Sequence, residues 1–156
     1  MFIPFDKISN SSRIWIYQSD KKFFKYDIKY INDELTLFCN NWIAHNNNLL
    51  SSFTIELNYF IILAVDETHF PTSGCSIDSS VNILKKIESK LKVNLFDRML
   101  IAVNSNDNIE ILNLSELKKK INSEMVIHNN LIYSKKDLKD NWKIKVENSW
   151  LKKYLP

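Results

Sequence analysis

The spacing of apolar side chains predicts the first elements of the chain. The segment 13–18, Arg-Ile-Trp-Ile-Tyr-Gln, is rich in β-branched and aromatic residues, which is typical of a strand. From Phe24 to Trp42 apolar residues recur every three or four positions, and this spacing is typical of an amphipathic helix. The asparagine run 46–48 ends the pattern, so we expect a strand followed by one long helix.

Alternation replaces the helical spacing after residue 51. Polar and apolar residues alternate over 52–57, and the segment 59–65 is almost wholly apolar. This pattern predicts two strands joined by a tight turn at Asn58, the second of them buried on both faces.

A second helix and two more strands follow. A loop over 66–74 leads into the helix, for which Ser73 or Ser76 is the expected N-terminal cap. Its predicted buried face consists of Ile77, Val81, Leu84, Ile87 and Leu91. Strands are expected at 99–103 and 109–112, and a short helix over 115–124 that lacks a capping box, because Lys118 follows Ser115 at the third position.

The order of these elements predicts an α+β fold. Strand, helix, strand, strand, helix and strand, plus one extra strand, match the ferredoxin-like split βαβ arrangement, in which two helices cover one face of an antiparallel sheet. We expect residues 1–125 to form a single α+β domain and residues 126–156 a basic C-terminal extension packed on it. Trp142 and Trp150 are the expected anchors of that extension.

Composition excludes several functional classes. The chain has 156 residues, of which 45% are hydrophobic, and this is enough apolar material for one core. Gly74 is its only glycine, which rules out glycine-rich phosphate loops and the dinucleotide fingerprint. Two cysteines and three histidines do not suffice for a four-cysteine zinc ribbon or a disulfide framework. We therefore expect no cofactor, no membrane span and a cytoplasmic location.

Charge is distributed unevenly along the chain. Residues 115–156 carry ten basic and five acidic side chains, although the whole chain has a net charge of only +3. Such a tail favours an RNA- or ribosome-associated role, and aromatic residues crowded into 15–30 would support it if Trp15 or Tyr17 were exposed. The alternative is an ordinary solvated surface, because lysine outnumbers arginine 19 to 2, as A+T-rich coding would produce. The same bias gives the rare Arg13 and Arg98 more weight than any lysine.

The segment 66–80 contains the most distinctive candidate site. Free backbone N–H groups at a helix N-terminus, together with serine hydroxyls, can bind an anion. The candidate ligand-binding residues are Ser73, Gly74, Cys75, Ser76, Asp78 and Ser79, although the Asp78 carboxylate disfavours a strongly anionic ligand. We expect Gly74 to have a positive φ or to allow a close backbone approach. The alternative is a capping turn in which Cys75 is a small buried side chain.

Cys75 is also the candidate nucleophile of a thiol-dependent enzyme. The dipole of the second helix would stabilise its thiolate, and His45 or His69 would act as the base, oriented by Asp66 or Glu67. A zinc site built from His45, His69, Cys75 and Asp66 matches no standard spacing. The alternative places His45 at the end of the first helix and His69 on a loop surface.

Several strings in the chain resemble a family of small bacterial proteins that are often catalogued as "ABC transporter ATPase". They are Arg-Ile-Trp-Ile-Tyr-Gln-Ser-Asp at 13–20, Ile-Leu-Ala-Val-Asp-Glu-Thr-His at 62–69, Ser-Gly-Cys-Ser-Ile-Asp-Ser-Ser at 73–80, Asn-Leu-Phe-Asp-Arg at 94–98 and Asn-Ser-Trp-Leu at 148–151. The chain has no Walker A loop, so the catalogue name does not describe its chemistry. The resemblance implies a family without a settled activity and assigns no catalytic residues.

Three functions are therefore in competition. The first is a small cytoplasmic binding module that holds a small anionic ligand or a protein partner at the segment 66–80. The second is a thiol-dependent enzyme, which requires Cys75 to lie within hydrogen-bonding reach of a histidine. The third is an RNA- or ribosome-associated adaptor, which requires the tail lysines to share one face.

Overall fold

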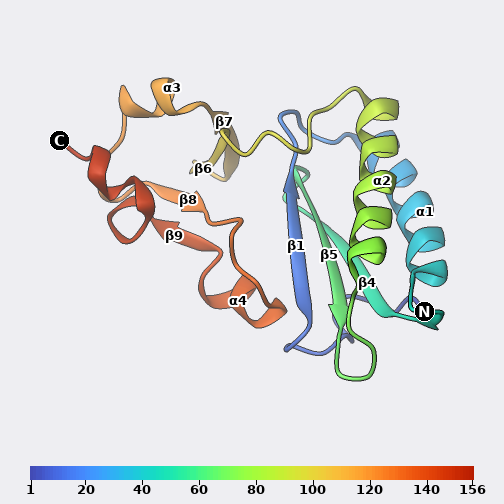
Figure 1. The fold of residues 1–156 in the computed structure, drawn as a ribbon. Helices are drawn as coiled ribbons and strands as arrows, with labels where there is room; N and C mark the ends of the chain where they lie inside the picture. Colours follow the sequence, from blue (N-terminus) through green and yellow to red (C-terminus); the bar gives the residue numbers. More distant parts are fainter.

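A computed structural model describes residues 1–156, and Figure 1 shows its two halves. The first half consists of β1 (Arg13–Gln18), α1 (Lys25–Asn41), β2 (Ile43–Ala44), β3 (Asn47–Asn48), β4 (Leu50–Glu56), β5 (Phe60–Asp66) and α2 (Gly74–Leu91). The second half consists of β6 (Ile101–Ser105), β7 (Asn108–Leu112), α3 (Leu114–Lys118), β8 (Val126–His128), α4 (Lys135–Asp140) and β9 (Lys143–Lys145), followed by the 3-10 helices η1 (Val146–Asn148) and η2 (Trp150–Tyr154).

The first half contains an antiparallel sheet of three strands in the order β1-β5-β4. Leu57 and Asn58 both have positive φ, 54° and 58°, and they form the turn between β4 and β5. Two such residues match the right-handed twist of a hairpin, which explains the asparagine. β5 is the central strand and is buried at every position except Asp66, as its apolar sequence predicts.

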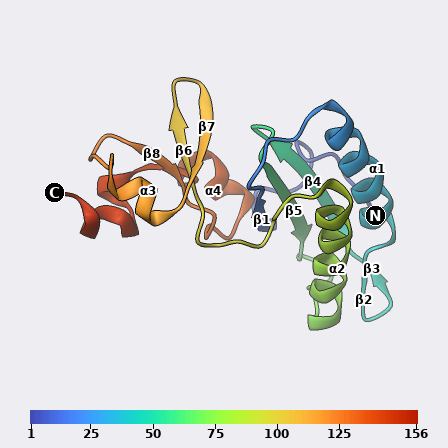
Figure 2. The ribbon, with the colours of Figure 1, turned by 90° about the horizontal axis from the view of Figure 1, so that it is seen from above.

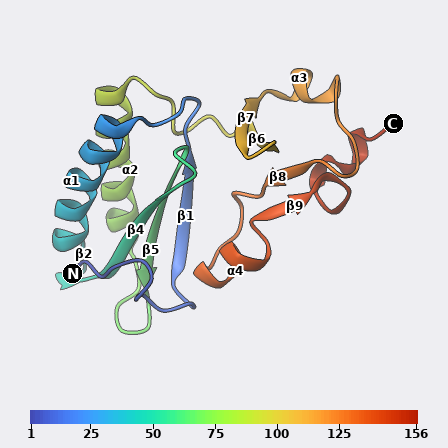
Figure 3. The same ribbon diagram turned by 180° about the vertical axis from the view of Figure 1, so that it is seen from behind.

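Two helices cover one face of this sheet, as predicted. Figure 3 shows α1 and α2 side by side, and Ile31, Leu35, Leu84 and Ile87 from these helices belong to the same buried cluster as the residues of that sheet face. α2 begins at the predicted cap, where the Ser73 hydroxyl accepts the Ser76 N–H at 3.1 Å.

The second half covers the opposite face of the sheet. Ile14, Phe60 and Ile62 from the sheet pack in one cluster with Ala102 and Trp142. Figures 1 and 2 place the second half beside β1, away from α1 and α2. Trp142 is therefore an anchor of the C-terminal segment, as predicted.

The fold is α+β with antiparallel sheets, but the ferredoxin-like order is not confirmed. β6 pairs with β7 and β8 instead of β1, in a second sheet of order β7-β6-β8-β9. β1 consequently lies at the edge of its own sheet. Strands from both sides of residue 125 share the second sheet, so the C-terminal segment contributes two of its four strands.

Two local predictions are wrong. α3 has a capping box, because its cap is Asn113 and Glu116 stands at the third position, where the prediction relied on Ser115. His45 does not end α1; it lies with Asn46 at positive φ, 49° and 64°, in a turn between the short strands β2 and β3. No helix combines the length and the apolar character that a membrane crossing requires.

Candidate functional site

The outer edge of β1 is only partly paired. At its start, the Ile14 N–H donates to the Tyr133 carbonyl at 2.9 Å, and the Lys135 N–H donates to the Ser12 carbonyl at 2.9 Å. In an antiparallel pair, successive residues direct their N–H and C=O groups alternately toward and away from the partner strand. The N–H and C=O groups of Ile16 therefore point away from β5, as the N–H of Ile14 does. No backbone group pairs with Ile16 on that side. β1 therefore presents an unpaired peptide group at its outer edge.

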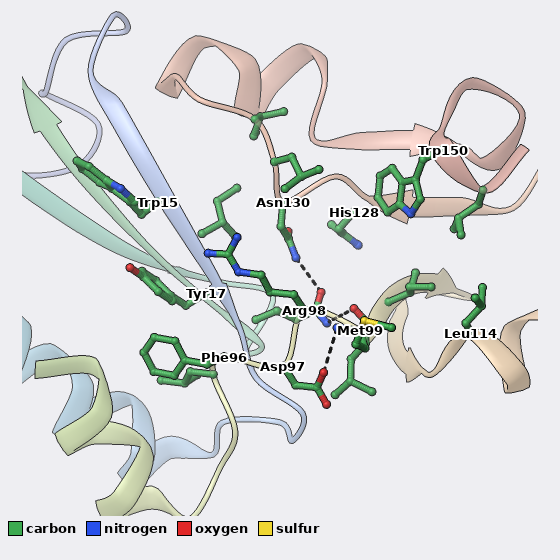
Figure 4. Close-up of a pocket in the computed structure, with 18 of the residues that line it drawn as sticks. Trp15, Tyr17, Phe96, Asp97, Arg98, Met99, Leu114, His128, Asn130 and Trp150 are labelled. Carbon is green, nitrogen blue, oxygen red and sulfur yellow. Dashed lines mark hydrogen bonds between the residues drawn. The ribbon is translucent and has the colours of Figure 1, made fainter. Parts of the chain in front are cut away.

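A groove of about 510 Å³ lies along this edge. Its walls are β1, the linker 95–101, the segment 128–133 and the C-terminal helix η2, and 16 of its 23 lining residues are hydrophobic. Figure 4 shows Trp15 and Tyr17 on β1, Phe96 to Met99 on the linker, and Asn130 and Trp150 on the opposite wall. Segments that are far apart in the sequence meet in this groove.

Large apolar side chains are exposed around the groove. Met99 is 73% exposed, Leu131 76%, Tyr133 60% and Trp150 46%. Met99 belongs to the linker, Leu131 and Tyr133 to the segment after β8, and Trp150 to η2. Trp150 thus faces the groove instead of anchoring the C-terminal segment in the core. Gathered exposed apolar side chains are typical of a binding surface.

Both arginines of the chain line the groove. The Arg13 guanidinium lies 4.6 Å from the ring centre of Trp15 and 5.1 Å from that of Tyr133. It also donates to the Thr72 hydroxyl at 3.3 Å, and its Nη1 lies 3.7 Å from a Glu67 carboxylate oxygen. Arg13 therefore connects the groove to the loop between β5 and α2.

Arg98 is exposed and takes part in no ion pair. Its neighbour Asp97 accepts the Met99 N–H at 3.0 Å. Burial raises the pKa of the Tyr17 phenol, while a hydrogen bond with Ser80 and the Arg98 charge lower it. Arg98 thus acts electrostatically on β1 and retains its hydrogen-bonding capacity for another molecule.

Side-chain hydrogen bonds connect three walls of the groove. The Asn130 amide donates to Gln18 Oε1 at 2.9 Å, and the Gln18 amide donates to the Leu100 carbonyl at 3.3 Å. These bonds join β1, the linker and the segment after β8. The unpaired outer edge of β1 therefore lies between the Ile14 and Tyr133 pair on one side and the Gln18 and Asn130 bond on the other.

His128 is a buried titratable group in the lining. Its ring lies 4.9 Å from the ring centres of both Phe60 and Trp142, and its Nδ1 is 3.2 Å from the Ala102 carbonyl oxygen. Because a carbonyl only accepts, Nδ1 carries the proton and Nε2 is a buried acceptor without a partner. Burial lowers the pKa of His128 to about 4, and the positive charge of Lys143 contributes to the lowering. The hydrogen bond to the Ala102 carbonyl acts in the opposite direction and raises the pKa.

The segment 66–80, where we predicted the site, satisfies most of its polar groups internally. Asp66 accepts the N–H and the hydroxyl of Thr68, and Glu67 accepts the same two groups of Thr72. The hydrogen bonds of Thr68 lower the pKa of Asp66. An anion at this loop would compete with hydrogen bonds that the chain already makes.

The first turn of α2 is capped in the same way. The Ser76 hydroxyl accepts the Ser73 N–H at 2.7 Å, and the Ser79 hydroxyl donates to the Cys75 carbonyl at 3.0 Å. Asp78 lies one turn into the helix and takes part in no ion pair. The expectation for Gly74 is wrong, because its φ is not positive and an added Cβ would meet nothing within 4 Å.

The structure does not assemble the predicted catalytic group. Cys75 is exposed, and it is not the buried side chain of the alternative interpretation. His69 lies near Asp66, whose pKa its charge helps to lower, while His45 lies in the β2–β3 turn. The only hydrogen bond at Cys75 is through its carbonyl, and no group of three potential metal ligands exists in the chain.

Sequence reasoning missed the groove, although one signal pointed to it. Arg13 and Arg98 stand out in a chain with 19 lysines, and both line the groove. No family model, no curated protein and no solved structure matches the chain, so the family resemblance stays a prediction.

Proposed function

We propose that the protein is a binding module whose ligand site is the groove along β1. The observation that carries the proposal is the concave apolar lining, with a volume of about 510 Å³, beside an unpaired strand edge. Pockets for small molecules commonly have volumes of about 300 to 1,000 Å³ and combine apolar walls with a few polar groups. Such a groove suits a compact, mainly apolar small molecule.

The exposed apolar residues support this site. Leaving Met99, Leu131, Tyr133 and Trp150 in water forgoes the burial that otherwise stabilises a fold. A molecule bound in the groove would cover these four side chains, which come from three of its walls. The loop 66–74 then has a supporting role, because Glu67 and Thr72 hold the Arg13 side chain that lies between Trp15 and Tyr133.

The test is a fragment screen read by two-dimensional ¹⁵N–¹H NMR on the uniformly labelled protein. Apolar fragments should shift the amides of Ile16, Met99 and Leu131. The amides of Cys75 and Ser76 should stay in place. Fragments that shift only the α2 N-terminus would instead support the originally predicted site.

A pair of matched variants controls the screen. Leu131→Asp adds a charge at an exposed groove position and should abolish the fragment shifts. Leu37→Asp makes the same change at an exposed position on α1, away from the groove, and should leave them unchanged. A screen in which no fragment shifts groove amides, or in which Leu131→Asp has no effect, would contradict the proposal.

A further inference from the structure

We propose that the groove recognises a compact apolar molecule that carries a single carboxylate, and that Arg98 binds this carboxylate. The inference rests on the proposed binding function and names the class of ligand. Three observations support it: the charge balance of the lining, the free guanidinium of Arg98 and the short unpaired stretch of β1.

The charges of the lining favour one negative charge. Arg13, Arg98 and Lys153 are its cations, and Asp97 is its only carboxylate. Glu67 lies beside Arg13 and offsets that charge from outside the lining. Among the lining side chains and Glu67, one positive charge is left without an anionic counterpart, and Lys118, whose ammonium lies 4.4 Å from the ring centre of the lining residue Tyr154, adds to the positive charge beside η2. A carboxylate supplies one negative charge, whereas a phosphate monoester carries close to two at neutral pH.

Arg98 is the lining cation whose charged group makes no hydrogen bond, ion pair or ring contact within the chain. Arg13 is stacked between two rings and donates to Thr72, and the Lys153 ammonium lies 5.1 Å from the ring centre of Tyr154. Arg98 forms no ion pair and is exposed on the linker wall. A guanidinium offers paired N–H donors whose geometry matches the two oxygens of a carboxylate.

The backbone of β1 offers a further donor. The N–H of Ile16 points toward the groove side of the strand, and no backbone carbonyl pairs with it. Unpaired strand edges commonly recruit another strand. Here the Ile14 and Tyr133 pair and the Gln18 and Asn130 bond enclose only the stretch between them, about 13 Å of strand at 3.3 Å per residue. This free stretch is shorter than a typical strand of five to six residues, which spans about 17–20 Å, so it suits a compact molecule better than an added peptide strand.

The experiment is a calorimetric titration at low salt with four probes. Phenylbutyrate has the apolar body and the carboxylate, phenylbutanol has the body alone, acetate has the charge alone, and phenyl phosphate has a double charge. We expect phenylbutyrate to bind roughly tenfold or more tightly than phenylbutanol or phenyl phosphate, since a hydrogen bond to a charged group is worth roughly 1.5–3 kcal/mol. Acetate should not bind measurably.

Variants assign the effect to Arg98. Arg98→Gln should weaken phenylbutyrate binding roughly tenfold and leave phenylbutanol binding unchanged. Arg98→Lys keeps the charge and should give an intermediate affinity. Lys85→Gln removes an exposed lysine of α2 that lies outside the groove, and it should change neither affinity. Circular dichroism of each variant verifies the fold.

The outcomes separate this inference from the proposed function. Equal affinities for phenylbutyrate and phenylbutanol, or an unchanged phenylbutyrate affinity in Arg98→Gln, would overturn the carboxylate assignment and leave the binding module intact. Tighter binding of phenyl phosphate than of phenylbutyrate would overturn the inference that the ligand carries a single negative charge. If NMR shifts fall outside the groove for all probes and fragments, the proposed function itself fails.

Discussion

Protonation of His128 should destabilise the fold in mildly acidic solution. The ring is 3% exposed and lies between Phe60 and Trp142, with the Nδ1 proton committed to the Ala102 carbonyl. A second proton would have to bind Nε2, which has no hydrogen-bond partner. The buried imidazolium would then lack both water and a counterion, and Lys143 would repel it.

The magnitude follows from the two pKa values of this histidine. Burial lowers the pKa in the folded protein to about 4, from 6.5 in the unfolded chain. A folded-state pKa below the unfolded value means that the unfolded chain binds more protons, so the free energy of unfolding falls as the pH drops below 6.5. The loss should be about 2 kcal/mol between pH 7 and pH 5 and should level off near 3 kcal/mol below pH 4.

Urea unfolding measures the effect in the wild type and in His128→Leu. The variant cannot titrate at this position, so its free energy of unfolding should vary less between pH 7 and pH 5, by about 2 kcal/mol. The lowered pKa values of Asp66 and Asp137 act only below pH 4 and cancel in the comparison. Equal pH dependence in the two proteins would refute the assignment of a buried neutral His128.

Three further predictions concern the thiols, the glycine and the basic tail. Iodoacetamide should modify only Cys75 in the folded protein, because Cys39 is buried and burial raises its pKa to about 12; mass spectrometry that finds two modified thiols before urea is added would contradict this. Gly74→Ala should leave the free energy of unfolding unchanged or raise it by up to about 1 kcal/mol, since its φ is not positive and the space above it is open, and a loss in urea unfolding would contradict the geometry. The ammonium groups of Lys118 and Lys153 both lie over the Tyr154 ring. If the tail binds RNA, replacing both lysines with glutamine should make the plot of log K against log salt less steep by roughly 1.4 in an electrophoretic titration. No shift of RNA by the wild type at low salt would leave these lysines as solvated surface.

Some of the tail lysines are engaged with other groups of the chain. Lys135 donates to the Ile8 carbonyl at 2.7 Å, and Lys120 forms an ion pair with Glu110 at 2.6 Å. The cations that remain for a polyanion are therefore fewer than the sequence suggests.

Local pattern was sufficient for the long elements of the first half, although not for the short strands β2 and β3. The apolar run 59–65 is the central buried strand β5, Asn58 takes the positive φ of the hairpin turn, and Ser73 caps α2. Each of these features depends on residues within a few positions of one another, where periodicity, turn chemistry and capping act.

Pairing between distant strands is what the sequence did not determine. The strand expected at 99–103 has the right composition to pair with β1, but in the structure β6 pairs with β7 and β8. Strand propensity describes a half-buried pleated surface and does not specify the neighbour. Because β6 lies elsewhere, the outer edge of β1 is left open beside the linker.

The candidate site follows from that tertiary choice. Trp15, Arg98, Leu131 and Trp150 come from four separate segments, and no spacing rule connects these segments along the chain. The segment 66–80 looked distinctive because serine, glycine and aspartate favour helix caps, and in the structure most of its polar groups serve the cap and the adjoining loop. The amino-acid sequence alone determined the two helices of the first half, the β4–β5 hairpin and the buried central strand, because short-range interactions specify them. Only the tertiary structure decided where a ligand could bind, because the groove exists only when β1, the linker and the C-terminal segment are brought together.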